Sequence, residues 1–150
     1  MTVTAQKIAN LIIETAHERA IPISNMKLQK LVYLSYGWFF AITDNKLFED
    51  DIQAWKFGPV IPSIYHKFKM FFSNPIPQDH FFKGDSEGID DDHKSLVNKI
   101  FEVYGGFSAE QLSNKTHEQN TPWDKAYTAG CSNIVIDDND IKEHFKQLLN

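Results

Sequence analysis

The stretch from Asn25 to Ile42 constrains the fold most strongly, because beyond Leu31 it is apolar almost all the way round a helix. Ser24 is a suitable N-cap, since its hydroxyl can accept a hydrogen bond from an amide of the first turn. A helix without a polar face is stable only when neighbouring elements cover it on every side. We therefore predict that a helix over residues 25–42 lies at the centre of a mainly helical domain.

Five further helices are predicted from N-caps and from apolar residues at helical spacing. Thr4 caps a helix that runs to about Ala20, and Ser108 with Gln111 forms a capping box for a helix through about His117. The others begin near Pro59 to Pro62, at about Asp91, and at a cap formed by Asp137 or Asp138. At 150 residues with 42% hydrophobic content, the chain is expected to form one compact domain over residues 1–150, a bundle of about six helices.

A small β-hairpin is predicted between the second and third helices. Asp44-Asn45 ends the second helix, and residues 47–48 and 52–55 are the expected strands. The acidic run of residues 49–51 is the expected turn, and Gly58-Pro59 is expected to end the hairpin. The third helix then follows, with an aromatic stripe, ending in Phe71 and Phe72, whose spacing is more typical of a core than of an interface.

Residues 73–92 are predicted to be an acidic, mobile connection, because they hold two prolines, two glycines and six acidic residues. Residues 1–78 carry 8 Lys and Arg against 6 Asp and Glu, whereas residues 79–150 carry 7 against 14. Nucleic-acid binding needs Lys and Arg clustered on one face, so we expect no direct contact with DNA or RNA. Asp90, Asp91 and Asp92 are instead candidates for contacting a basic partner protein.

Neither a metal site nor a cofactor site is expected. Cys131 is the only cysteine, which excludes an intrachain disulfide and a zinc site built from several cysteines. The six histidines form no HExxH motif. The acidic run 137–140 resembles a calcium loop, but Lys142 stands where that loop requires glycine, and a helix cap is the better interpretation.

The opening residues lack the basic and apolar regions of a signal peptide, and the apolar stretch 31–42 is too short to span a bilayer. A cytoplasmic protein with no membrane contact is therefore expected. The sequence contains no nucleophile-elbow, P-loop or dinucleotide motif. Cys131 with His117 as its base is the remaining catalytic hypothesis, although most lone cysteines are packing groups.

Two aromatic corners are candidate partner-binding sites. In residues 55–60 bulky aromatics flank Lys56 and are followed by Gly-Pro, which suits a packed corner between hairpin and helix or the rim of a binding groove. In the second, His117 precedes Pro122-Trp123. His117 is interpreted either as a structural histidine bonded to a backbone carbonyl or as the polar tip of an interface patch beside Trp123.

Three stretches together carry a resemblance to a known family. They are Lys27 to Trp38, which begins KLQKLVY, then Ala54 to Pro62 (AWKFGPVIP) with Tyr65, and Thr116-His117 with Pro122-Trp123. In order and spacing they resemble the Panacea domain, the family that includes the SocA-like and GepA-like antitoxins. The resemblance covers about residues 4–149, and its middle motif is the most specific.

The resemblance implies a non-enzymatic antitoxin that neutralises a cognate toxin by direct binding, and that in one SocA-like case delivers its toxin to a cytoplasmic protease as an adaptor. A small cytoplasmic hydrolase and a phage or mobile-element accessory protein that binds a host factor remain alternatives. The candidate partner-binding residues are Trp55, Lys56, Phe57, Gly58, Pro59, Tyr65, His117 and Trp123, with Asp90, Asp91 and Asp92.

Overall fold

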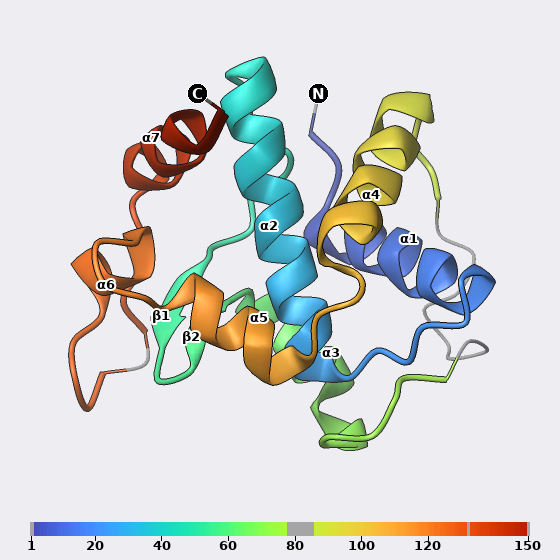
Figure 1. Ribbon diagram of the computed structural model, residues 1–150, viewed down its shortest axis with the longest axis horizontal. Coiled ribbons are helices and arrows are strands. Elements are labelled where there is room, and N and C mark those ends of the chain that lie inside the picture. Colours follow the sequence, from blue (N-terminus) through green and yellow to red (C-terminus); the bar gives the residue numbers. More distant parts are fainter. Residues whose placement is uncertain (1, 78–85, 132, 150) are drawn as a thin grey trace.

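The computed structural model describes residues 2–77, 86–131 and 133–149. Within these ranges the chain forms seven α-helices, one 3₁₀ turn and a two-stranded antiparallel hairpin (Figure 1). The elements are α1 (Ala5–Glu18), α2 (Asn25–Thr43), β1 (Gln53–Trp55), β2 (Gly58–Val60), α3 (Pro62–Phe68), η1 (Lys69–Phe71), α4 (Asp91–Tyr104), α5 (Ala109–Thr116), α6 (Pro122–Ala126) and α7 (Asp138–Leu149). The predicted mainly helical fold with a small hairpin is confirmed.

Helix α2 runs through the middle of the molecule, with α7 on one side, α1 and α4 on the other, and α5 across one end (Figure 1). Every residue from Leu28 to Gly37 is buried, as expected for a helix without a polar face. Gly37 allows the closest approach of α7, because a Cβ at this position would lie 2.1 Å from the ring of Phe145. The predicted central position of this helix is confirmed.

The predicted caps explain where the helices begin. The side chains of Thr4, Ser24 and Ser108 each accept a hydrogen bond from an amide in the first turn. Asp137 accepts a hydrogen bond from the amide of Asp140 at 3.2 Å, which confirms that the acidic run caps α7. Within the described residues, none of these helices combines the length and the apolar character that a bilayer crossing requires.

The predicted pairing of the hairpin is wrong. Strand β1 pairs with β2 in the register Gln53 to Val60, whereas Leu47 and Phe48 are buried in the core. The turn therefore lies at residues 56–57. Gly58 follows the turn and has a φ of 116°, a value that glycine adopts far more readily than other residues. The acidic run 49–51 serves another purpose, since Asp50 accepts hydrogen bonds from the amide of Ala5 and from a side chain of α3.

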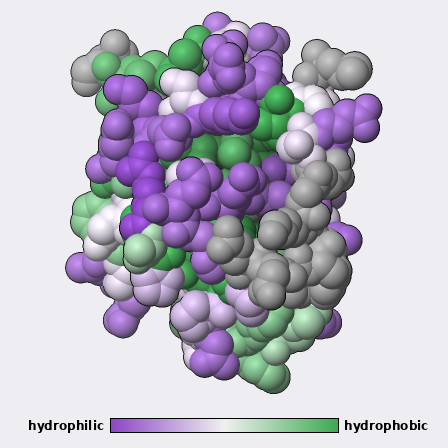
Figure 2. All heavy atoms as spheres, turned by 90° about the vertical axis from the view of Figure 1, so that its right-hand side faces the viewer, coloured by the Kyte–Doolittle hydropathy of each residue, from purple (hydrophilic) through white to green (hydrophobic). Residues whose placement is uncertain are grey.

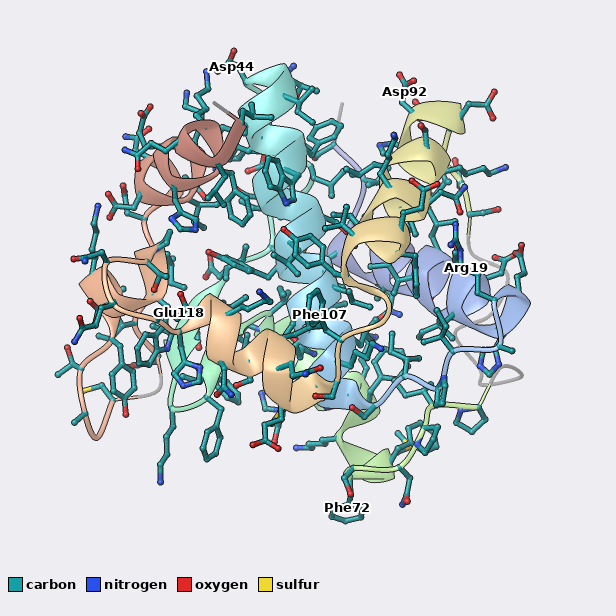
Figure 3. The ribbon with its side chains drawn as sticks, in the orientation of Figure 1. Arg19, Asp44, Phe72, Asp92, Phe107 and Glu118 are labelled. Carbon is teal, nitrogen blue, oxygen red and sulfur yellow. The ribbon has the colours of Figure 1, made fainter. Side chains whose placement is uncertain are left out.

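The third helix is shorter than predicted. It begins at Pro62 as expected, but its α-helical part ends at Phe68, and η1 continues the chain to Phe71. Phe68 is buried, whereas Phe72 is 80% exposed and points away from the molecule (Figure 3). Part of the predicted connection, residues 78–85, lies outside the described residues. The start of the connection is attached to the core through buried Ile76, whose amide donates a hydrogen bond to the carbonyl of Ile23 at 2.8 Å.

Candidate protein-binding surface

The hairpin is held by three helices through its backbone carbonyls. Three alternate residues of the hairpin, 55, 57 and 59, each accept a hydrogen bond from a side chain of a different helix. The pairs are Trp123 Nε1 of α6 to Trp55 O at 2.5 Å, Ser113 Oγ of α5 to Phe57 O at 2.5 Å, and Lys30 Nζ of α2 to Pro59 O at 2.9 Å. Because the donors come from separate elements, these bonds fix both the position and the tilt of the turn relative to the core.

Helix α2 also supplies a buried polar strip that binds the backbone after the hairpin. The side-chain carbonyl of Gln29 accepts from the amide of Ile61 at 2.9 Å, and its amide group donates to Asn25 at 3.0 Å. Asn25 in turn donates to the carbonyl of Tyr65 at 3.2 Å. This strip orients the start of α3 against α2, since buried polar groups require such partners.

Lys30 is the least expected member of this strip. Only 1% of the residue is exposed, and burial lowers the pKa of its ammonium group to about 7. A Cβ at Gly58 would lie 3.1 Å from Lys30 Nζ, so the glycine leaves room for the amine. Asn25, Gln29 and Lys30 were not predicted to belong to this site, although polar residues within an otherwise apolar helix were a usable signal.

The second aromatic corner, formed by His117 and Trp123, also supports the hairpin. The Nδ1 atom of His117 is hydrogen-bonded to the carbonyl of Ser113, and therefore carries the proton, because a carbonyl can only accept. The ring of His117 meets Trp123 edge to face at 5.2 Å, and Trp123 stacks on Tyr127 at 4.6 Å. These contacts favour the structural interpretation of the half-buried His117, and Trp123 is only 9% exposed.

The hairpin turn is where this support reaches the surface. Lys56 is exposed, Phe57 is 57% exposed, and the Lys56 ammonium lies 5.5 Å from the centroid of the Phe57 ring. Half-buried Trp55 packs edge to face on Tyr65, with the ring centroids 4.8 Å apart. The motif thus divides into a buried part, Gly58 and Pro59, and an outward part that is available to a partner.

The acidic candidates lie elsewhere. Asp90, Asp91 and Asp92 are exposed at the start of α4, and Figure 3 places Asp92 at the end of the molecule remote from the hairpin turn. The Asp90 carboxylate caps α4 by accepting from the amide of His93 at 3.0 Å, and this hydrogen bond lowers the pKa of Asp90. The structure therefore does not bring the acidic candidates together with the aromatic ones.

No contact supports the hypothesis that Cys131 is a nucleophile with His117 as its base. Cys131 is exposed in the loop after α6, and no hydrogen bond joins its thiol to the half-buried ring of His117 in the part of the chain described here. Across residues 2–77, 86–131 and 133–149, no group of three or more His, Cys, Asp or Glu side chains is arranged to hold a metal ion. The surface built by the hairpin is suited to binding through aromatic contact and charge.

Comparison with known proteins identifies the family to which this arrangement belongs. Residues 28–124 match the family described as antitoxin SocA-like, Panacea domain. The chain belongs to this family. The Panacea chain is also 31% identical over 159 aligned residues to antitoxin SocA of Caulobacter vibrioides (strain NA1000 / CB15N), an alignment that covers 97% of this chain and 84% of the relative. No solved structure matches it.

The matched range contains the three side-chain donors that hold the carbonyls of the hairpin, Lys30, Ser113 and Trp123. The most specific sequence motif of this Panacea domain, residues 54–62, is thus explained by the hydrogen bonds that side chains of the helices make to its backbone. Membership of an antitoxin family implies a toxin as partner and points to a non-catalytic role.

Proposed function

We propose that this Panacea domain is an antitoxin that neutralises a cognate toxin by direct protein–protein binding in the cytoplasm. The observation that carries the proposal is the hairpin turn, which is fixed by three helices from behind and exposes Lys56 and Phe57 in front. A turn already held in one conformation loses little conformational entropy on binding. An exposed aromatic side chain on such a turn is typical of the anchors that dominate interface energies.

Co-expression with the adjacent gene tests the proposal. Expression of that gene alone is expected to stop growth, and this chain is expected to restore growth and to co-purify with its product. Phe57→Ala should weaken the measured affinity by about tenfold or more, since it removes an anchor of the kind found at interface hot spots. Val103→Ala is the matched control, because Val103 is 60% exposed on α4, which lies apart from the hairpin in Figure 1. Failure of the unmodified chain to bind or to rescue would refute the proposal.

The same experiment separates occlusion from delivery to a protease. If the domain acts as a proteolytic adaptor, the half-life of the toxin falls when the antitoxin is present, whereas simple occlusion leaves the half-life unchanged. A hydrolase, the alternative function, is tested with Cys131→Ala, because the residue is exposed and its replacement leaves the core intact. Rescue that survives this change supports binding as the mechanism.

The acidic start of α4 supports a second contact with the toxin. Asp91 and Asp92 are exposed in the first helical turn, where they are free to face a basic surface that binds phosphates. Opposite charges on two proteins accelerate their association, and salt weakens the effect. This contact is independent of the hairpin, because the two lie at different ends of the molecule (Figures 1 and 3).

A further inference from the structure

Phe72 has an unusual backbone conformation in an unusual place. Its φ is 54° and its ψ is −124°, a combination that is sterically unfavourable for any residue other than glycine. The side chain is 80% exposed, and neighbouring Met70 is 51% exposed. Packing of the Phe72 ring within the domain therefore does not offset the backbone strain. The strained backbone directs this large aromatic side chain into solvent (Figure 3).

An open hollow of about 490 Å³ lies beside this projection. Ser73 and Pro75, which follow Phe72 in the chain, form part of its wall, and Ile21 and Phe107 contribute apolar surface. Figure 2 shows hydrophobic side chains gathered at the lowest part of the molecule, where Figure 1 places η1. The projecting Phe72 is thus followed directly in the chain by Ser73, a residue of the wall of the hollow.

The described residues that line the hollow include one cation, Lys27, and no Asp or Glu, although the protein as a whole is acidic. Lys27 lines it, is only 7% exposed, and donates one hydrogen bond, to the carbonyl of Gly105 at 2.8 Å. Among the described residues no carboxylate pairs with this ammonium group, and burial lowers the pKa of Lys27. The capping residues Ser24 and Ser108 also line the hollow, which therefore receives the positive ends of α2 and α5.

A buried cation without a counter-charge is unfavourable until an anion reaches it. The apolar walls and the adjacent Phe72 favour an anion carried by a protein segment over a free ion, since a free ion gains nothing from them. Two further cations are exposed, Lys69 in η1 and Lys56 in the hairpin turn. The chemistry of this side fits a partner surface on which acidic and apolar residues alternate.

We propose that this side of the molecule docks an acidic segment of the partner protein, with Phe72 inserted into an apolar pocket of the partner and a partner carboxylate placed in the hollow beside Lys27. The identity of the partner as the toxin rests on the function proposed above. The surface extends the contact of the hairpin turn and is distinct from the acidic start of α4.

Isothermal titration of the purified chain with the product of the adjacent gene tests the docking surface. Phe72→Gly removes the aromatic ring and relieves the strain, so affinity should fall by about tenfold or more while the melting temperature is unchanged or raised. Ser73→Glu places a carboxylate at the mouth of the hollow and should also lower affinity by about tenfold, more strongly at low salt. Gln147→Glu, at an exposed position of α7, is the matched control and should stay within about twofold of the unmodified chain.

The outcomes separate the two proposals. If the unmodified chain binds and either Phe72→Gly or Ser73→Glu keeps its affinity, the docking surface is wrong and the antitoxin function stands. If the unmodified chain binds nothing, both proposals are overturned. Loss of affinity in both variants, with melting temperatures preserved and the control unaffected, supports the docking surface.

Discussion

Lys30 shows how one buried residue links the hairpin to pH. Its amine donates to Pro59 whether charged or neutral, but burial lowers its pKa to about 7 from the model-compound value of 10.5. At pH values between about 7 and 10.5, the Lys30 amine is protonated in the unfolded chain and neutral in the folded protein. The free energy of unfolding therefore rises with pH in this window, and this contribution is lost as pH falls through about 7.

We predict that the free energy of unfolding of the unmodified protein, measured by urea denaturation, rises between about pH 7 and about pH 9 by up to about 1.4 kcal/mol per pH unit more than that of Lys30→Met. The methionine variant keeps the aliphatic part of the side chain and lacks the titrating group. Lys99→Met, at an exposed position, should keep the pH slope of the unmodified protein. Equal slopes for the Lys30 variant and the unmodified protein would contradict the prediction.

At the scale of elements, the contact of α2 with α7 depends on the missing side chain of Gly37. A methyl group there would lie 2.1 Å from the ring of Phe145, which is itself buried and packed against Tyr33 and Trp38. Alanine favours a helix by about 1 kcal/mol over glycine, but overpacking a core costs about 1–3 kcal/mol, and a contact this short places the cost at the upper end.

Gly37→Ala is therefore expected to lower the free energy of unfolding by about 1–2 kcal/mol, measured by chemical denaturation. Adding Phe145→Leu should recover part of the loss, because the smaller side chain leaves room for the methyl group. Gly106→Ala is the control: a Cβ at that position meets no atom within 4 Å, so its effect should stay within about 0.5 kcal/mol. A Gly37 variant as stable as the control would refute the close packing of the two helices.

At the scale of the whole molecule, charge is separated along the fold. The start of α4 carries Asp90, Asp91 and Asp92, whereas Lys27 and the N-terminal ends of α2 and α5 line the hollow beside η1. A protein with opposite charges at its two ends is oriented by the field of a charged partner before contact. Asp90 must be kept in any test of this idea because it caps α4, whereas Asp91 and Asp92 are not needed for the cap.

The double variant Asp91→Lys with Asp92→Lys is expected to slow association with the toxin several-fold at low ionic strength, as followed by stopped-flow fluorescence. The difference should shrink as salt is added, because screening shortens the range of the field. Glu102→Lys with Glu143→Lys makes the same change in net charge at exposed positions away from the start of α4. An association rate equal to that of the unmodified chain would rule out steering by the acidic end.

Several elements were predictable because their causes are local. The caps of α1, α2 and α5 depend on residues within one helical turn, and all three form as predicted. The central place of α2 follows from its lack of a polar face. The sequence also directed attention to residues 55–59, and the structure favours their interpretation as a packed corner, while their role in partner binding stays a prediction.

Other features were decided by contacts between residues far apart in the chain. Ser113 and Trp123 reach the hairpin across 56 and 68 residues, so no short window of sequence contains both partners. The hairpin register was mispredicted for the same reason, since Leu47 and Phe48 have strand-like character but are buried in the core. The strain at Phe72 was not predictable either, because it arises where η1 ends and the chain turns toward Ile23.

The sequence by itself determined where most of the helices begin, how they are capped and that α2 is buried, because periodicity and capping act within a few residues. Only the tertiary structure decided which backbone carbonyls the buried Lys30 and its neighbours hold, and which aromatic side chains remain outside. The physical reason is that a buried polar group must find a partner wherever the fold brings one, and that choice is made by packing across the whole chain.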